Sequence, residues 1–507
     1  MKTRGSGVSH SVRALAGTLA LLTLAACGGG GGSSAFDDRV GDASQYANQC
    51  AAPRSGTDPY TGEAYPDVQG TLANERDWVH AYMNAIYLWY KEIPSVDSSG
   101  YTASAYGSDY AALDAYFQAL KTPNTTSSGK LEDQFSFTYP TAAWDALAQS
   151  GVTVSYGLQF AALATAPPRD FRVAYTEPNR PSSNDGVDRG AKILAIDGVD
   201  MINGSDVDTL NAGLFPSAAG EQHVFRFEDT DGTTQDVTLT AEDVTETPVQ
   251  NVQTISTSTG SVGYLLFNDH IATAEGELKN AIQTLADDDV SDLVLDIRYN
   301  GGGYLDIASE LAYMIAGPAQ TAGKVFERLK YNDKNPLADT DSATTGFHST
   351  TVGFDPSVAD GSALPYLNLS KVYVLVGAGT CSASEAVING LRGVGVDVVL
   401  IGDTTCGKPY GFYQADNCGT SYFAIEFQGV NNAGFGDYAD GFTPDCAVDD
   451  DFDHALGDPS ESLLATALSY RDSGACPSTS KRASLVSPVK VLRSPVRENL
   501  IVTPPQR

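Results

Sequence analysis

The segment GTCSASE at 379–385 places two serines and a cysteine in one short turn, and hydroxyl and thiol side chains are the usual protein nucleophiles. A serine needs a neighbouring base to take its proton, and the nearest downstream histidine is His454. A second polar turn, DTTCGKPYG at 403–411, contains Lys408. A lysine amine is therefore a candidate base for Ser382.

Each of these turns follows a segment with the composition of a buried strand. KVYVLV precedes the first turn and DVVLIG precedes the second, with the helical pattern EAVINGLRG between them. Such alternation predicts parallel strands whose carboxyl ends carry the functional loops on one edge of a sheet. We therefore expect Ser382 and Lys408 to meet, although 26 positions separate them.

An exposed lysine is a poor base, because a pKa near ~10.4 leaves roughly one amine in 2,500 neutral at pH 7. Burial lowers a lysine pKa by up to ~3 to 5 units, into the range that general-base catalysis favours. Gly407 and Pro409 would hold the chain tightly around such an amine. Ser382 opens a helix whose free N–H groups stabilise negative charge, and Ser384 is expected to be an N-cap or packing residue. The prediction is a Ser382 nucleophile with a Lys408 base.

Other chemistries have weaker support. The remaining histidines lie in no comparable motif, and the strongest of them, His270, is interpreted as a surface or strand-end residue. A Cys381 nucleophile is disfavoured in an oxidising compartment. The DDD runs at 287–289 and 449–451 suggest metal ligands, but solvated acidic surface is favoured. No metal or cofactor is expected.

Length and composition limit the protein class. A chain of 507 residues predicts two to four domains, and 42% hydrophobic content permits real cores. The net charge of -32 argues against nucleic acid as a partner.

The first residues have the features of an export signal. A basic start precedes the 13-residue apolar run ALAGTLALLTLAA, which is too short to span a bilayer. LAAC, ending at Cys27, resembles the lipobox of bacterial lipoproteins, and a glycine-rich tether follows. The expectation is a signal peptide at 1–26, a lipid anchor on Cys27 with a flexible leader at 27–73, and a place in the cell envelope. Gly28, rather than aspartate, favours the outer membrane by resemblance, with the protein facing the periplasm.

The rest of the chain divides into four parts. NERDWVHAYMNAIYLWYKEIP and SDYAALDAYFQALK predict a helical N-terminal domain at 74–150, with one apolar stripe formed by Trp78, Tyr82, Ile86, Trp89 and Ile93. Short alternating strands predict a β-rich domain at 152–246. Alternating strands and helices predict an α/β domain at 250–475 with a mostly parallel sheet. The basic, proline-rich segment 476–507 is expected to be disordered. The fold class is multidomain α/β (α+β).

Two stretches of the β-rich part resemble a PDZ domain. YGLQF, which comprises Tyr156, Gly157, Leu158, Gln159 and Phe160, stands where such domains have their carboxylate-binding loop. RGAKILAIDGVDM is similar to their following strand and turn. Such a module binds a peptide as an added strand. A structural β-domain that binds no peptide remains the alternative.

The two turns and one glycine-rich segment resemble a known enzyme family. TCSASEAVINGLRGVGVDVVLIGDTTCGKP and LVLDIRYNGGGYLDIASELA are similar to the carboxyl-terminal processing (tail-specific) serine proteases. The resemblance covers residues 74–475 and implies a ClpP/crotonase-like core with a Ser382 nucleophile and a Lys408 base. It also implies an oxyanion hole from the N–H groups of Gly302 and Ala383, and an acyl-enzyme intermediate. Its substrates would be exported proteins or peptides with accessible C-termini, while the oligomeric state stays unknown.

Departures from the family pattern leave alternatives open. The family often has glutamine four positions after the lysine, where this chain has Phe412 and the nearest glutamine is Gln414. A catalytically inactive peptide-binding lipoprotein is therefore the second hypothesis. Six cysteines follow Cys27 and are expected to form disulfides, with Cys381 to Cys406 or Cys406 to Cys418 as candidate pairs.

Overall fold

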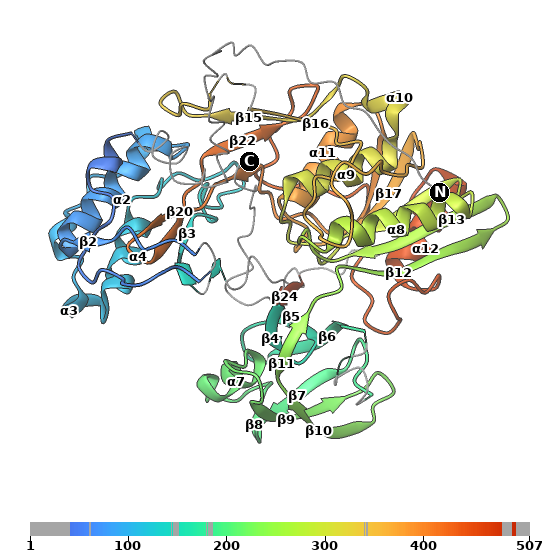
Figure 1. The fold of residues 1–507 in the computed structure, drawn as a ribbon. Helices are drawn as coiled ribbons and strands as arrows, with labels where there is room; N and C mark the ends of the chain where they lie inside the picture. The colour runs from blue at the N-terminus through green and yellow to red at the C-terminus, as the bar shows by residue number, and fades with distance from the viewer. Residues whose placement is uncertain are drawn as a thin grey trace, which may run out of the picture.

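The computed structural model describes residues 41–59, 62–142, 144–145, 152–178, 180, 186–338, 340, 343–478 and 489–492. Figure 1 shows three parts of the chain: an N-terminal helical part, a β-rich module and an α/β domain. The predicted signal peptide and Cys27 lie outside the described residues. No helix in the described ranges has the length and apolar character needed to cross a bilayer.

The α/β domain is built on a six-stranded sheet. Its strands, in spatial order, are β12 (Val249–Thr257), β13 (Gly260–Phe267), β14 (Asp292–Asp296), β17 (Lys371–Val376), β18 (Asp397–Gly402) and β23 (Cys446–Ala447). Strands β12 and β13 form an antiparallel hairpin, and the four other pairings are parallel. The mostly parallel sheet predicted for this domain is present, but the other sheets differ. Outside it, every pairing of the described strands except β1–β2 is antiparallel.

Helices cover both faces of this sheet. They are α8 (Ala274–Asp287), α9 (Leu305–Ala316), the short α10 (Pro318–Thr321), α11 (Ala383–Gly393) and α12 (Ser462–Ser473). Alternate strand residues point to opposite faces. Leu265 and Leu293 join one core with α8, α9 and α11, whereas their neighbours Tyr264 and Val294 join a second core with α12. The strand-to-helix order thus sends the turns after β14, β17 and β18 to one edge.

Two smaller sheets extend the domain. One contains β16 (Thr344–Gly346), β15 (Val325–Tyr331), β22 (Phe427–Val430) and β19 (Tyr410–Gly411). The other contains β20 (Ala415–Asn417), β21 (Thr420–Phe423) and β3 (Phe137–Pro140). Because β3 belongs to the predicted helical region, this region is joined to the α/β domain by main-chain hydrogen bonds.

The N-terminal helical part confirms the predicted helices but not all their residues. Its elements are η1 (Gly41–Gln45), β1 (Gln49–Cys50), β2 (Val68–Gln69), α2 (Leu72–Ile86), η2 (Tyr90–Glu92), η3 (Ser98–Gly100), α3 (Ala103–Tyr106) and α4 (Asp109–Ala119). Helix α2 ends at Ile86, because Tyr87 adopts an extended conformation and the Leu88 N–H donates to Ile425 O at 2.8 Å. The predicted extension of the stripe to Trp89 and Ile93 is therefore wrong.

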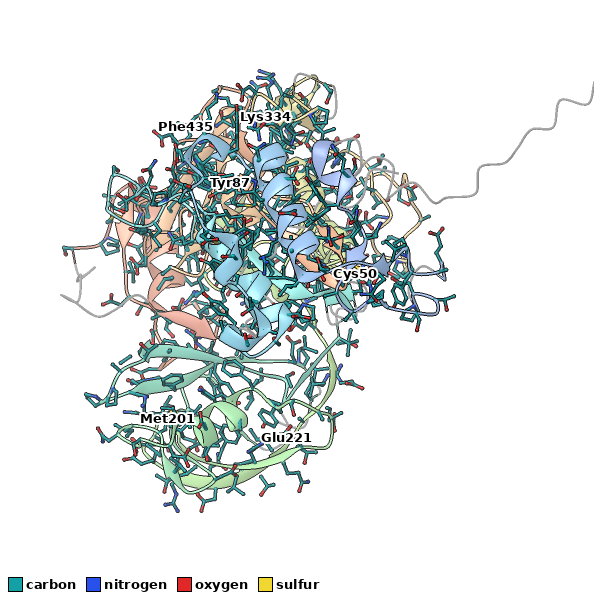
Figure 2. All side chains as sticks on the ribbon, turned by 90° about the vertical axis from the view of Figure 1, so that its left-hand side faces the viewer. Cys50, Tyr87, Met201, Glu221, Lys334 and Phe435 are labelled. Carbon is teal, nitrogen blue, oxygen red and sulfur yellow. A yellow bond between two sulfur atoms is a disulfide. The ribbon has the colours of Figure 1, made fainter. Side chains whose placement is uncertain are left out.

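The flexible leader predicted for 27–73 is also wrong from residue 41 onward. Cys50 is buried and forms a disulfide with Cys418, 368 positions away. Figure 2 shows Cys50 and Tyr87 against the body of the molecule, with Met201 and Glu221 in the separate module below. The Cys50–Cys418 disulfide attaches this segment to the α/β domain. The spacing of cysteines in the sequence did not identify Cys418 as the partner of Cys50.

The β-rich module confirms the predicted strands. Its elements are β4 (Val152–Ser155), β5 (Leu158–Ala164), β6 (Asp170–Thr176), β7 (Lys192–Ile196), β8 (Val199–Asp200), α7 (Val207–Leu214), β9 (Gln222–Glu228), β10 (Thr234–Thr240) and β11 (Glu242–Thr245). The main sheet has the order β10-β9-β7-β6-β5-β24, in which the last strand, β24 (Lys490–Leu492), comes from the segment predicted to be disordered. The prediction of disorder is wrong for residues 490–492, because these residues pair with the outer edge of β5. Amino-acid composition alone does not show that a distant part of the chain offers such an edge.

Candidate active site

Ser382 lies in the turn between β17 and α11, at the N-cap of the helix. Its backbone has φ 62° and ψ -117°, a conformation that costs a non-glycine residue of order 1–3 kcal/mol. The side chain is 2% exposed, and its Oγ has no hydrogen-bond partner among the described residues. The turn thus presents a hydroxyl that no protein group has engaged.

Lys408 follows β18 and is also 2% exposed. Burial lowers its pKa to about 7, although Asp133 and Glu385 act in the opposite direction. Its Nζ lies 4.7 Å from the ring centre of Phe412 and 5.1 Å from that of Phe135. The predicted desolvation of this amine is therefore present, and two aromatic rings contribute to it.

Glu385 connects the two turns. Its Oε2 accepts hydrogen bonds from the Ser382 N–H at 3.0 Å and the Lys408 N–H at 2.8 Å. The other oxygen, Oε1, accepts from the Gly407 N–H at 2.9 Å and Thr405 Oγ1 at 2.5 Å. One buried carboxyl oxygen is therefore shared by the main chains of the predicted nucleophile and base, which confirms that the two turns meet.

A disulfide links the same two turns. Cys381 and Cys406 are bonded with their Cα atoms 5.2 Å apart, and Cys406 N–H also donates to Thr380 O at 3.0 Å. The expected Cys381–Cys406 pair is present, whereas the alternative pair of Cys406 and Cys418 is not, because Cys418 binds Cys50. Cys446 and Cys476 form the third disulfide.

The glycine turn after β14 lies directly against the serine. A Cβ on Gly302, where φ is +101°, would come within 2.8 Å of Ser382 Cβ and 3.0 Å of the Ala383 nitrogen. The Gly302 N–H itself donates to Asn300 Oδ1 at 3.0 Å. Ala383 is the first residue of α11, so its N–H has no acceptor within the helix. Both predicted oxyanion groups adjoin Ser382, and one of them is occupied by Asn300.

Residues 261–447 match the family model described as Peptidase family S41, and residues 74–137 match the Peptidase S41 N-terminal domain. The turns that carry Ser382, Lys408 and Gly302 all fall inside the first match. Residues 261–447 are therefore similar to S41 peptidases, and this segment is called the S41 domain below.

Similar proteins agree with this assignment. This chain resembles the carboxyl-terminal-processing protease of Picosynechococcus sp., at 27% identity over 240 residues, which is 46% of this chain and 49% of that protein. It also resembles carboxyl-terminal-processing peptidase 1, chloroplastic, of Arabidopsis thaliana, at 26% identity over 44% of this chain and 40% of that protein. The chain thus spans about half the length or less of these curated relatives.

A solved structure covers more of the molecule. The crystal structure of a candidate S41 protease from Bacteroides fragilis aligns with a TM-score of 0.59 and 25% identity, over 81% of this chain and 98% of that one. The mixed α/β multidomain arrangement is therefore that of an S41 protease structure.

The contacts show how Gln414 and Phe412 are placed relative to Lys408. Gln414 is not near the lysine, since its amide binds Trp144 Nε1 at 2.8 Å and the carboxylate of Asp416 at 3.0 Å. Phe412, at the position of the family glutamine, instead places its ring beside Lys408. The candidate base Lys408 therefore has an aromatic ring at the position where the resembled family pattern often has an amide.

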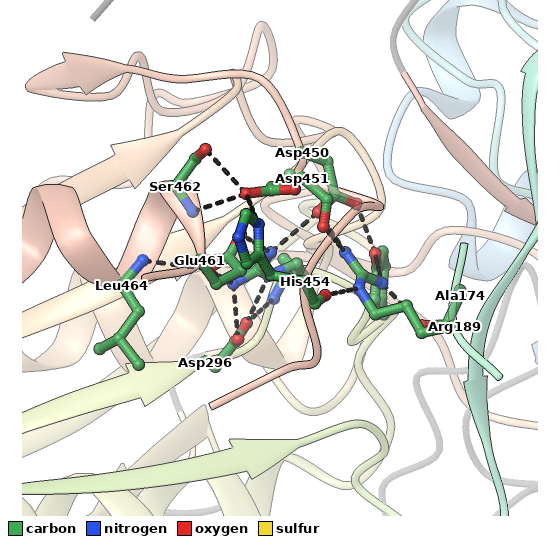
Figure 3. A network of polar contacts seen from close by, with 12 residues as sticks. Ala174, Arg189, Asp296, Asp450, Asp451, His454, Glu461, Ser462 and Leu464 are labelled. Atoms are coloured by element: carbon green, nitrogen blue, oxygen red, sulfur yellow. Dashed lines mark hydrogen bonds and ion pairs between the residues drawn. The ribbon is translucent and has the colours of Figure 1, made fainter. Parts of the chain in front are cut away.

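Other sequence interpretations require correction. His270 is only 1% exposed, with Nδ1 3.0 Å from Asn300 Oδ1, so it is a buried histidine behind the glycine turn rather than a surface residue. Asp450 is likewise not solvated surface, because Arg189 and Arg298 bind its carboxylate at 2.7 and 2.8 Å (Figure 3). Sequence charge patterns alone do not show which arginines will be buried beside it.

One cluster in the described ranges has the spacing of a metal site: Cys381, Glu385 and Cys406. Its two sulfurs are bonded to each other, so it offers no thiolate ligand. The carboxyl of Glu385 is surrounded by hydrogen-bond donors, which leaves little room for a cation.

Sequence reasoning missed three residues of the S41 site. Glu385 was signalled by the S-x-x-E spacing of a capping box after Ser382. Asn300, which binds the Gly302 N–H, and Phe135, which comes from the N-terminal part, had no such local signal. The role of Phe135 depends on a contact between distant parts of the chain. Asn300 contacts Gly302 only two residues away, but no sequence motif marks that contact.

The predicted peptide loop lies in the β-rich module, away from Ser382 (Figure 1). Tyr156, Leu158 and Phe160 turn their side chains into the module core, and Tyr156 OH donates to Gly213 O at 2.9 Å. Gly157 has φ +71°, and a Cβ there would lie 2.7 Å from Arg180. Residues 156–160 line a cavity of about 120 Å³ with the end of α7, so the loop offers main chain rather than side chains to a ligand.

Proposed function

We propose that this protein is a serine endopeptidase that hydrolyses peptide bonds of exported proteins, near their C-termini. The observation that carries the proposal is the shared Glu385 oxygen, which brings the main chains of Ser382 and Lys408 together in a buried site. The S41 family match and the carboxyl-terminal-processing relatives support the same reaction.

The proposed reaction uses the two side chains as a dyad. Lys408 Nζ, neutral because burial lowers its pKa to about 7, takes the Ser382 hydroxyl proton as Oγ attacks the substrate carbonyl. The resulting ammonium gives that proton to the leaving amine, and Ser382 retains the acyl group as an ester. Water then attacks the ester with Lys408 again as the base, which releases the acid and restores the serine.

The developing oxyanion would be stabilised by the main chain. The Ala383 N–H at the start of α11 is one donor, and the Gly302 N–H is the second once it leaves Asn300 Oδ1. Removing one such donor typically costs ~2.7–4 kcal/mol of transition-state stabilisation. In this arrangement substrate binding must replace one hydrogen bond that the resting protein makes.

The β-rich module is proposed to be PDZ-like and to bind the substrate's terminal segment. The support is the main-chain loop 156–160 with the cavity beside it, at the start of β5, whose outer edge pairs only with the three-residue strand β24. A peptide can pair with such an edge while its end reaches the loop. The accessible C-terminus of an exported protein is the corresponding partner.

The proposed location is the cell envelope, with lipid attached to Cys27 and the protein facing the periplasm from the outer membrane. The lipobox-like LAAC and three disulfides support export. Mass spectrometry of the purified N-terminal peptide tests this: a diacylglyceryl adduct on Cys27 is expected. Loss of membrane association in Cys27→Ala should accompany it, and an unmodified Cys27 would contradict the anchor.

Cleavage of unfolded casein tests the catalytic proposal. Wild type should degrade casein, while Ser382→Ala and Lys408→Met should each reduce the rate by at least a thousandfold with little change in thermal stability. Ser357→Ala, on an exposed turn, is the matched control and should retain full activity. Casein left intact by wild type would favour the inactive peptide-binding alternative.

A further inference from the structure

The edge of the β-rich module is already covered by a strand of the same chain. Strand β24 pairs antiparallel with β5, with Lys490 opposite Ala162, Val491 opposite Ala161 and Leu492 opposite Phe160. In the sheet order β24 lies outside β5, on the edge that β6 leaves open (Figure 1). This is the geometry of an extended peptide added to a sheet.

The direction of the pairing matters. Residue numbers rise along β24 as they fall along β5, so the direction of β24 from Lys490 to Leu492 points along β5 toward Leu158 and the loop at Gly157. A substrate strand whose end reaches that loop must run in the same direction. The added strand therefore follows the path that the proposed function gives to a bound peptide.

Charge favours this pairing. Residues 152–246 contain 6 Lys/Arg and 16 Asp/Glu, a net charge of -10, and Glu177 and Glu246 line the cavity beside the loop. Residues 481–507 contain 6 Lys/Arg and 1 Glu, a net charge of +5. An acidic module attracts a basic segment from an otherwise acidic protein, an effect that weakens with salt.

The connection to the rest of the chain is short. Cys476 is fixed to Cys446 beside the central sheet, and only residues 477–488 separate it from Val489, which packs on the second core of the S41 domain. A strand tethered over so short a distance has an effective concentration near the module in the millimolar range. Even a weak intrinsic affinity would keep the site occupied.

We infer that the outer edge of β5 is a peptide-binding site that Lys490–Leu492 of the same chain occupies in the resting protein. A substrate peptide must displace this strand in order to bind. This inference rests on the proposed peptide-binding role of the module. It also specifies the kind of peptide that competes best. This is an extended segment that combines aliphatic and basic residues, as VKVLR at 489–493 does. Because β24 competes for the site, only peptides that bind the module more strongly than β24 does can occupy it.

The direct test measures peptide binding in the Ser382→Ala background, where no cleavage occurs. The probe is a fluorescein-labelled synthetic peptide with the sequence of residues 485–497, LVSPVKVLRSPVR. Truncation after Pro488 should tighten probe binding at least tenfold, because the tethered competitor is gone. The matched truncation after Val496, which keeps β24, should bind as weakly as the full chain.

A point variant separates strand pairing from chain length. Alternate residues of an antiparallel strand turn their N–H groups to the partner, so Val491→Pro with Leu492→Pro removes a ladder donor whichever residue supplies it. This double variant should bind the probe like the chain truncated after Pro488. The matched Val486→Pro variant, outside β24, should behave like the full chain.

The results separate this inference from the proposed function. If the full chain and the truncation after Pro488 bind the probe with equal affinity, the inference that β24 occupies the site is overturned. The proposed peptide binding by the module is then unaffected. Failure of both forms to bind the probe also overturns it, and removes the binding role of the module. Casein cleavage, measured independently, shows whether the dyad is active in either case.

Discussion

Lys408 illustrates how surroundings alone can convert a lysine into a base. Burial lowers its pKa to about 7, against the opposing effects of Asp133 and Glu385. An ammonium over aromatic faces is favoured by roughly 0.5–2 kcal/mol, so Phe135 and Phe412 also act against deprotonation while keeping water out. The lowered pKa therefore reflects desolvation that exceeds four favourable influences on the charged form, two carboxyl groups and two aromatic rings.

The first prediction concerns pH. Because the neutral amine is the reactive form, kcat/KM should rise about tenfold per pH unit below pH 7 and level above it. Initial-rate measurements with a peptide substrate from pH 5 to 9 check this. A lysine with an ordinary pKa would give rates that still climb at pH 9, which contradicts the assignment.

The same pKa predicts a stability change. Between about pH 7 and ~10.4 the unfolded chain binds a proton at Lys408 that the folded chain does not, so stability should rise with pH through this window. In Lys408→Met this contribution is absent. Urea unfolding of both proteins at pH 7 and 9 tests the sign: the stability difference should shift toward wild type at pH 9, and a constant difference would refute it.

Phe412 gives a test of the aromatic surroundings. Phe412→Leu keeps the site apolar but removes a ring face that favours the ammonium, so the midpoint of the acid limb should move to lower pH by up to about one unit. Phe225→Leu, in the module core, is the control for lost aromatic bulk and should leave the midpoint unchanged. A midpoint that stays in place in Phe412→Leu would show that the ring is only filling space.

At the scale of elements, the two turns depend on connections between secondary structures rather than on either turn alone. Both the Cys381–Cys406 disulfide and the Glu385 hydrogen bonds join the start of α11 to the turn after β18. The Cys446–Cys476 disulfide closes a loop of similar length, 30 positions against 25, but it does not join the two turns. The chain therefore contains its own control for the catalytic disulfide.

Removing each disulfide should give similar stability losses but different activities. Loop-closure entropy predicts roughly 3.5 kcal/mol for either pair when both cysteines become alanine. Only Cys381→Ala with Cys406→Ala should also lower kcat by more than tenfold, because its turns carry Ser382 and Lys408. Thermal unfolding and casein cleavage of the two double variants make the comparison. Equal activity in both would mean that Glu385 alone positions the turns.

Sequence periodicity predicted the elements well and their mutual contacts poorly. The strands before Ser382 and Lys408 were recognisable because buried parallel strands are continuous apolar runs. The end of α2 at Ile86 was not, since the Leu88 N–H finds its acceptor at Ile425. Phe135 and β24 were missed for the same reason: their partners lie hundreds of residues away, where no local pattern reports them.

At the scale of the whole molecule, Arg189 attaches the β-rich module to the S41 domain. Its guanidinium donates to Asp450 at 2.7 Å (Figure 3) and to Tyr299 OH at 2.6 Å. Arg298 donates to the same Asp450 oxygen, Oδ1, at 2.8 Å. Tyr299 immediately precedes Asn300, whose side chain holds the Gly302 N–H. The position of the module is thereby connected to a proposed oxyanion donor.

Arg189→Met should loosen this attachment. A buried charge that loses a partner typically costs 3–5 kcal/mol, although Arg298 still compensates Asp450 here and should reduce that cost. Limited proteolysis between β11 and β12 should accelerate, and kcat should fall more than KM changes. Arg226→Met, which breaks an exposed pair with Asp236 inside the module, is the control. Unchanged cleavage between these strands would show that the apolar contacts suffice.

The disulfide between Cys50 and Cys418, together with the pairing of β3 and β21, has a consequence for biosynthesis. These contacts join segments made first to segments made almost last, so folding must await most of the chain and will be slow. Phe135 belongs to the early segment and Lys408 to the late one. If Lys408 is the base of the proposed reaction, a nascent chain lacks the dry pocket for it, and we expect such a chain to be proteolytically inactive until both ends of the molecule have come together.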